Sequence, residues 1–140
     1  MITFVDTNVL VSARDASEPE KQQQAQAWMN HLWATRTGRT SVQVLNEYYV
    51  TVTRKLSPGL DLATARADVV DLGAWKPAAV DEATIAAAFE LEDRFSLSWW
   101  DGLVVAQAIS LRCDRLLTED LQEGQRFDGV TVTNPFLHTP

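Results

Sequence analysis

Four carboxylates stand on four different expected elements of the chain, at Asp6, Glu47, Asp101 and Asp120. Oxygen ligands suit hard divalent cations, and Mg²⁺ binds one or more carboxylates while it keeps several of its waters. Carboxylates that meet without a cation repel one another, and at least one pKa rises. If the fold brings these acids together, they predict a site for a divalent metal.

Three of these acids also have a structural explanation that requires no metal. Asp6 ends an expected strand and can cap the helix after it, as aspartate often does. Asp101 matches a capping box with Ser98 at the start of an apolar helix. Asp120 can cap the short stretch that follows it, and Glu119 competes with Asp120 for a place in a metal site. The local pattern leaves both interpretations open.

A surface salt bridge explains Glu47 poorly. Partners on a helix lie three or four residues away. Here those positions hold only uncharged residues, namely Gln43, Val44, Val50 and Thr51. Solvation of the carboxylate remains an alternative, but the absence of a basic partner favours a different role for Glu47.

Short apolar segments alternate with helical patterns, which predicts an α/β fold with a mainly parallel sheet. We expect strands at 2–5, 114–118 and 130–132, a short extended piece at 39–41 and an edge strand at 74–80. We expect helices at 17–36, 42–56, 61–72, 81–95 and 98–113, a turn at 7–11, and a turn of helix with a loop at 119–129. Sites in such sheets lie beyond the carboxyl ends of the strands, where Asp6 and Asp120 are expected.

Length and composition fit one globular domain, with 140 residues, 46% of them hydrophobic and 22% charged. The single cysteine excludes an internal disulfide and a cysteine-rich zinc site, and it fits a reducing compartment. No signal peptide and no apolar run of roughly 18 residues is visible, so we expect a soluble cytoplasmic protein. The longest candidate run, 97–111, is interrupted by Asp101, Gln107 and Ser110.

The net charge of -7 argues against a polyanionic ligand when it is taken alone. Carboxylates loaded with a divalent cation carry much less local negative charge than the formula suggests. Basic residues also gather near the helix that holds Glu47, at Arg36, Arg39, Arg54 and Lys55. A nucleic-acid ligand therefore stays open. Arg14, Arg54 and Lys55 are candidate contacts for RNA phosphates, with ordinary solvated charges as the alternative.

The segments that hold the acids resemble PIN-domain ribonucleases, and most closely the VapC-type toxins of toxin–antitoxin pairs. The resemblance rests on Phe4–Leu10, Ser41–Glu47, Leu97–Asp101, Leu117–Asp120 and Val132–Phe136. One such segment alone would be weak, but their order and spacing within the chain are specific. Gly102 departs mildly from the alanine that is common after the third acid.

The resemblance implies a single PIN domain over residues 1–140, with a Rossmann-like three-layer α/β/α fold. It implies that Asp6, Glu47, Asp101 and Asp120 are both catalytic residues and ligands of Mg²⁺ or Mn²⁺, with Asn8 as a polar support. Thr118 is a second support. The implied function is metal-dependent endoribonuclease activity of a toxin. The implied partners are RNA, a cognate VapB-type antitoxin and a second copy of the chain, with no membrane.

Two other interpretations compete with this one. Haloacid-dehalogenase-type phosphatases also place an aspartate after their first strand, but they require a second acid two positions later, where this chain has Asn8. A non-catalytic domain, such as a receiver-like phosphoacceptor or an inactive PIN scaffold, would keep its function without Asp6 or Asp101. Growth on induced expression separates these classes, because a toxin stops growth only with its acids in place.

Overall fold

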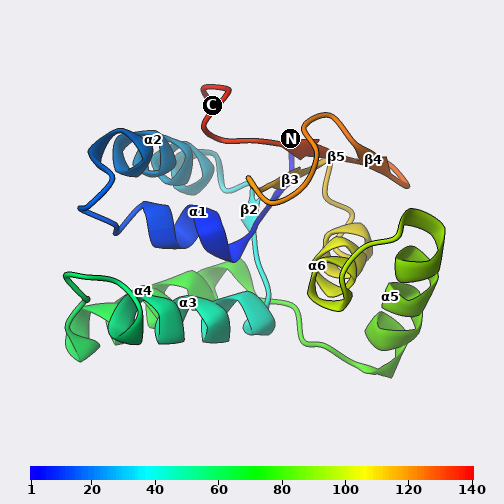
Figure 1. Ribbon diagram of the computed structural model, residues 1–140, viewed down its shortest axis with the longest axis horizontal. Coiled ribbons are helices and arrows are strands. Elements are labelled where there is room, and N and C mark those ends of the chain that lie inside the picture. Colours follow the sequence, from blue (N-terminus) through cyan, green and yellow to red (C-terminus); the bar gives the residue numbers. More distant parts are fainter.

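The computed structural model describes residues 1–140 and contains a five-stranded sheet in the order β2-β1-β3-β5-β4 (Figure 1). The strands are β1 (Thr3–Val5), β2 (Gly38–Arg39), β3 (Arg115–Leu117), β4 (Arg126–Phe127) and β5 (Val130–Thr133). Neighbouring strands are parallel except β4 and β5, which are antiparallel. This confirms the predicted α/β fold with a mainly parallel sheet.

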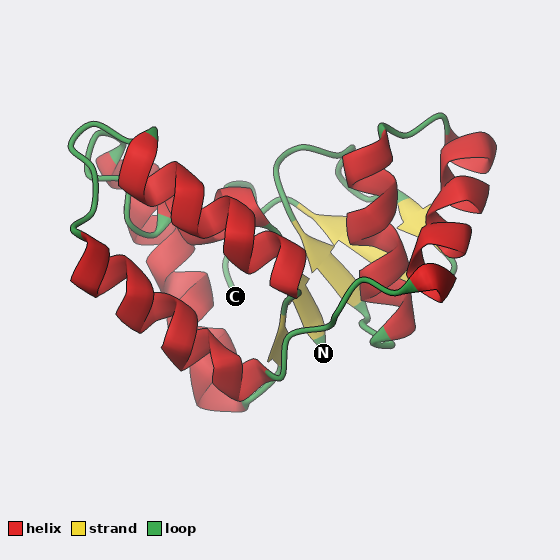
Figure 2. Ribbon diagram, turned by 90° about the horizontal axis from the view of Figure 1, so that it is seen from below, coloured by secondary structure: helices red, strands yellow, loops and turns green.

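Helices complete a three-layer α/β/α arrangement, and all five predicted helices are present with ends that differ by a few residues. They are α2 (Pro19–Thr35), α3 (Val42–Arg54), α4 (Leu62–Leu72), α5 (Glu82–Phe95) and α6 (Trp99–Ser110), joined by α1 (Thr7–Ser12) and the 3-10 turn η1 (Gly73–Trp75). Figures 1 and 2 show α1 to α4 together on one side of the molecule and α5 with α6 on the other. None of these helices has the length and apolar content needed to cross a membrane.

The core lies where β1, β3 and α6 meet. Phe4, Val5, Leu116 and Leu117 have no exposed surface, and all residues of α6 from 102 to 108 are buried. Gly102 lies where α6 approaches α5, because a Cβ added there would be 3.3 Å from the carbonyl oxygen of Ala88. This close packing gives a physical reason for the glycine, and it fixes the start of α6 that carries Asp101.

Residues 7–11 form the first part of α1 rather than the predicted turn. Asp6 caps this helix, because its Oδ1 accepts a hydrogen bond from the backbone N–H of Thr7 at 2.7 Å. The polar pair Thr7-Asn8 suggested a turn, but it occupies the first turn of a helix whose apolar face, Val9 and Leu10, is buried. The prediction of a turn was therefore wrong.

The predicted edge strand at 74–80 is also absent. The segment begins with η1, and Lys76 then takes a left-handed conformation with φ of 50°. Only a single bridge joins it to the rest of the sheet region, between Ser41 and Ala78. Pro77 has no N–H to donate to a ladder, which favours a bridge over a strand.

The predicted turn of helix within 119–129 is replaced by a strand, β4, which forms a tight hairpin with β5. Asp128 and Gly129 connect the two strands, with φ values of 47° and 97°. Positive φ at both central residues is the geometry of a type I′ turn, for which Asp-Gly is a preferred sequence. The Asp-Gly pair was therefore the signal for this hairpin.

Candidate metal centre

Asp6 follows β1 and is 6% exposed, so its carboxylate sits at the buried end of the parallel sheet. Its Oδ1 accepts from the Thr7 backbone, and its Oδ2 accepts from the Thr118 hydroxyl at 2.9 Å. Burial raises the pKa of Asp6 to about 6, and the nearby charges of Asp120 and Glu47 act in the same direction against the lowering effect of the hydrogen bonds. Asp6 therefore both caps α1 and belongs to the acidic cluster.

Asn8 and Thr118 link Asp6 to Asp120 across the end of the sheet. The Asn8 amide donates to the Thr118 hydroxyl at 2.8 Å and to Oδ2 of Asp120 at 3.1 Å. Partial burial raises the pKa of Asp120, the Asn8 hydrogen bond opposes this, and the charges of Glu119 and Asp101 add to it. No helix follows Asp120, so it has no capping role.

Glu119 points its carboxylate to a different partner. Its Oε2 pairs with Nζ of Lys21 at 2.7 Å, whereas its backbone N–H donates to Oδ1 of Asn8 at 3.2 Å. Of the two neighbouring acids, Asp120 is the one that shares Asn8 with Asp6 through its side chain. The geometry thus favours Asp120 over Glu119 as a member of the cluster.

Glu47 lies on α3 and is held by neutral side chains. Its Oε2 accepts from the hydroxyl of Thr7 at 2.8 Å, and its Oε1 accepts from Nε2 of Gln43 at 2.9 Å. Gln43 in turn accepts from Nε2 of Gln107 on α6 at 3.0 Å. Gln107 is 1% exposed, and its own Oε1 has no partner. Neutral amides therefore orient Glu47 without neutralising its charge.

These amides were not among the residues proposed from the sequence. Gln107 did give a signal, since it interrupts the most apolar helix and a buried amide needs a partner. Its partner could not be read from the chain, because Gln43 lies 64 positions away.

Asp101 is half-buried in the first turn of α6. The Ser98 hydroxyl accepts from the backbone N–H of Asp101 at 3.2 Å, which is one half of the capping box. The reciprocal bond is missing, and the Asp101 carboxylate has neither a hydrogen bond nor an ion pair. The cap therefore fixes the backbone of Asp101 and leaves its carboxylate free.

The four carboxylates have the chemistry of a hard-cation site. None of them forms an ion pair with a basic side chain, and the repulsion between them contributes to the raised pKa values of Asp6 and Asp120. As the side chains stand, no group of three acidic, histidine or cysteine residues is arranged to hold an ion. Mg²⁺ needs only one or two direct carboxylates, since waters fill its remaining positions. The donor set fits such an ion with partly water-mediated binding.

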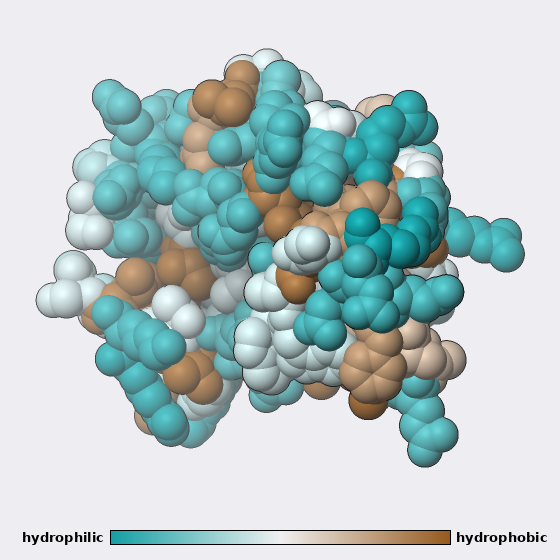
Figure 3. All heavy atoms as spheres, turned by 45° about the vertical axis from the view of Figure 1, so that its right-hand side comes forward, coloured by the Kyte–Doolittle hydropathy of each residue, from teal (hydrophilic) through white to brown (hydrophobic).

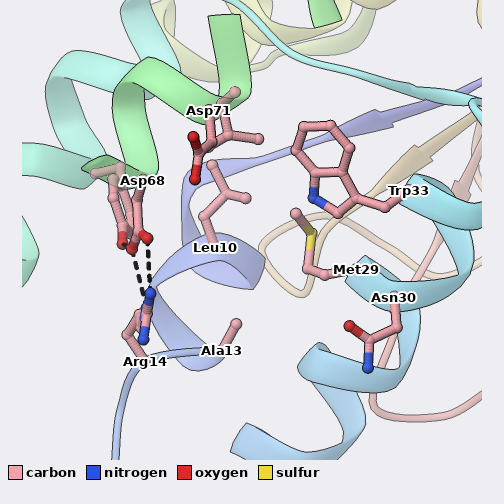
Figure 4. A pocket seen from close by; sticks show the side chains of 10 residues that line it. Leu10, Ala13, Arg14, Met29, Asn30, Trp33, Asp68 and Asp71 are labelled. Atoms are coloured by element: carbon pink, nitrogen blue, oxygen red, sulfur yellow. Dashed lines mark hydrogen bonds and ion pairs between the residues drawn. The ribbon is translucent and has the colours of Figure 1, made fainter. Parts of the chain in front are cut away.

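The basic residues proposed from the sequence lie in different places. Arg14 lines a separate cavity of 270 Å³ between α1, α2 and α4, and Figure 4 shows it directed to Asp68. The two bonds of this pair measure 2.9 and 2.7 Å, and Asp68 also accepts from the Tyr48 hydroxyl. Arg54 is exposed at the end of α3, and Lys55 lines a cavity together with Glu47. The structure thus brings Lys55, but not Arg14, to the side of the carboxylates.

Comparison with known protein families identifies a match over most of the chain. A family model described as the PIN domain matches residues 3–127, which includes all four carboxylates. No curated protein matches the chain.

Proposed function

The chain belongs to the PIN domain family, whose members are typically metal-dependent nucleases, and from this premise we propose that it is a Mg²⁺-dependent endoribonuclease. The observation that carries the proposal is the geometry of its acids. Asp6 and Asp120 follow the parallel strands β1 and β3, and the charges of Glu47 and Asp101 reach them from α3 and α6. A nuclease needs such a cluster to hold a cation against a phosphate.

The ligands of this cation are Asp6, Glu47, Asp101 and Asp120, and Mn²⁺ can replace Mg²⁺. A bound cation of this kind neutralises charge on the scissile phosphate and acidifies the attacking water. Asp101 has no other partner, so it is free to orient that water and accept its proton. The water oxygen would then bond to phosphorus in line while the bond from phosphorus to the ribose oxygen on the opposite side breaks, and that oxygen would take up a proton from solvent water.

The polar supports limit where these acids can move. Asn8 and Thr118 hold Asp6 and Asp120 at a fixed spacing, and Gln43 directs Glu47 to the same edge of the sheet. Partners that orient metal-binding residues are commonly worth 10–100-fold in activity or metal affinity. Fixed acids of this kind would favour cleavage at a defined position in the RNA.

We further propose that the chain is a single PIN domain of residues 1–140, a cytoplasmic toxin inhibited by a VapB-type antitoxin, and a homodimer. The support for an interface is apolar surface on α3 and α4, where the exposed Val42 and Val70 line a cavity of 500 Å³ and Leu62 is also exposed on α4. Figure 3 shows that hydrophobic side chains reach the surface in separate patches among hydrophilic ones. Exposed apolar patches often mark protein–protein contacts.

The test is cleavage of total RNA by the purified protein with Mg²⁺ and with EDTA, beside Asp101→Asn. We expect discrete metal-dependent cuts from the parent and a loss of at least about 100-fold in the variant, because a neutral amide is a weaker ligand and cannot accept the proton. Asp93→Asn, an exposed acid of α5 outside the cluster, is the matched control and should cut like the parent.

If Asp101→Asn cuts as well as the parent, the assigned centre is wrong. Induced expression gives a second measurement in the cell. The parent and Asp93→Asn should arrest growth, whereas Asp101→Asn should not. Arrest by the Asp101 variant would favour the non-catalytic alternative.

A further inference from the structure

Trp100 is the most exposed of the aromatic side chains, with 62% of its surface open to solvent. The other four tryptophans have a structural role that accounts for them. Trp28 is buried, Trp33 stacks against Trp75 with ring centroids 4.9 Å apart, and Trp99 lies 5.3 Å from the ring of Phe89. Trp100 forms no aromatic pair, does not pack against the core and donates no hydrogen bond. Nothing in the fold explains an indole at this position.

The surroundings of Trp100 connect it to the candidate centre. It precedes Asp101 on α6 and lines a cavity of 720 Å³ whose opposite wall is α3. The cavity reaches Thr7 and Glu47, which are joined by the 2.8 Å hydrogen bond of the centre. Apart from Trp100 and Val50, the lining side chains are polar or charged. The cavity is thus an open extension of the centre with one large aromatic wall, and it is lined by polar side chains whose carbon atoms form much of the exposed surface.

We propose that this cavity is a subsite for an unpaired RNA nucleotide, with its base stacked on Trp100 and its phosphate on Lys55. The inference rests on the proposed nuclease function and adds a binding determinant to it. Aromatic side chains beside a groove hold single-stranded nucleic acid by stacking, which tolerates any base. Lys55 is exposed, lines the same cavity and has no ion pair, so its charge is available to a phosphate.

The negative net charge of the chain is a reason to expect that stacking on Trp100 contributes to RNA affinity. With a net charge of -7, the chain as a whole repels RNA at long range. Stacking does not depend on charge, and it supplies affinity where phosphate contacts are few.

The test measures binding of a labelled single-stranded oligoribonucleotide in the Asp101→Asn background, where the RNA stays intact. Trp100→Ala and Trp100→Leu should weaken affinity by about 5- to 150-fold, which corresponds to one stacked base. Trp100→Phe keeps an aromatic ring and should retain most of the affinity. Leu137→Ala, which removes an exposed apolar side chain 65% open to solvent in the C-terminal segment and outside this cavity, is the matched control and should bind like the parent.

Lys55→Gln tests the phosphate contact separately. Loss of one phosphate contact to a single strand should reduce the slope of log affinity against log salt by about 0.7. An unchanged slope would remove Lys55 from the subsite. The Trp100 variants should leave this slope unchanged, because stacking releases no counterions.

Cleavage assays on the same variants with Asp101 intact separate this inference from the function on which it rests. Trp100-dependent binding without any metal-dependent cutting would reject the nuclease and retain the subsite. Asp101-dependent cutting with the same KM in Trp100→Ala would retain the nuclease and overturn the subsite. Binding by Trp100→Leu equal to the parent, or no RNA binding by the parent, would also overturn it.

Discussion

Asp6 uses its two carboxylate oxygens for different purposes. One oxygen caps α1, and the other accepts from Thr118 inside the acidic cluster. Both bonds favour the charged form, yet burial outweighs them and raises the pKa from 3.8 to about 6. A buried carboxylate with this balance is destabilising when it ionises without a cation, so the centre carries an energetic cost in the metal-free protein.

This balance predicts an unusual pH dependence. The folded protein binds the Asp6 proton more tightly than the unfolded chain, so this group's contribution to stability is fully present below about pH 4 and is lost as the pH rises through about 6. The shift corresponds to about 3 kcal/mol at most. In EDTA, Asp6→Asn should therefore gain stability relative to the parent between pH 4 and 7, while the amide oxygen can still cap α1.

Urea denaturation of both proteins across this range measures the difference. Comparing the two removes the opposite contribution of exposed caps such as Asp61 and Asp81, whose lowered pKa values favour the folded state at higher pH. Mg²⁺ should then stabilise the parent more than the variant at pH 7. The prediction would be contradicted if, in EDTA, the free energy of unfolding of the parent rose relative to that of Asp6→Asn as the pH increases.

At the scale of elements, strand β2 packs against the ring of Trp75, which in turn packs against Trp33. Gly38 in β2 faces Trp75, and a Cβ added there would lie 2.3 Å from Cζ2 of that ring. Trp75 cannot withdraw freely, because its ring stacks on Trp33. We expect Gly38→Ala to lower the free energy of unfolding by about 1–3 kcal/mol through overpacking.

Gly73→Ala is the matched control, since a Cβ at this position meets nothing within 4 Å. It should be neutral or slightly stabilising because alanine restricts the unfolded chain. Thermal melts of the two variants give the comparison. Equal melting temperatures would show that Trp75 moves aside at little cost.

The sequence located the long elements well and the short ones poorly. The helices α2 and α4 were predicted because their apolar residues recur at helical spacing over several turns. The strand β4 has only two residues, Arg126–Phe127, which are too few to show an alternating pattern, so the Asp-Gly turn that joins it to β5 was its one signal in the sequence. Helix α1 was missed because it is also short. The polar pair Thr7-Asn8 indicated a turn, and the two buried residues Val9 and Leu10 were too few to indicate a helix.

The candidate site likewise has a part that could be predicted from the sequence and a part that could not. The acids could be proposed one by one because carboxylates at element ends have few roles. The hydrogen bonds that hold them, such as those of Gln107 to Gln43 and of Asn8 to Thr118, join residues far apart in sequence. These contacts depend on how α6 approaches the first turn of α3 and on the pairing of β1 with β3, and neither can be predicted from the spacing of residues in the sequence.

At the scale of the whole molecule, the C-terminal segment after β5 is tied back to α2. The indole N–H of Trp28 donates to the carbonyl oxygens of Pro135 at 3.1 Å and His138 at 3.0 Å. Lys21 adds a cation–π contact 4.6 Å from the ring centroid of Phe136. The buried ring of Trp28 thus couples the end of the chain to the helical layer.

Trp28→Phe should release this segment. The change removes the N–H donor and part of the buried ring, and we expect a loss of about 1–3 kcal/mol in stability with faster proteolysis beyond Thr133. Trp100→Phe is the control, since that exposed ring donates no hydrogen bond and its replacement should change neither property. Cleavage of the tail at the parent's rate in Trp28→Phe would show that the segment is held by other contacts.

The order of strands in the sheet has a consequence for the synthesis of the protein. Strand β1 emerges first from the ribosome, yet its neighbour β3 begins at Arg115. At 5–20 residues per second, β1 waits roughly 5–20 s for that partner. Asp120 is made later still, so the growing chain lacks the complete set of four acids until β3 and the residues just after it have been made. The acids that follow these two strands can therefore meet only after β1 and β3 have paired.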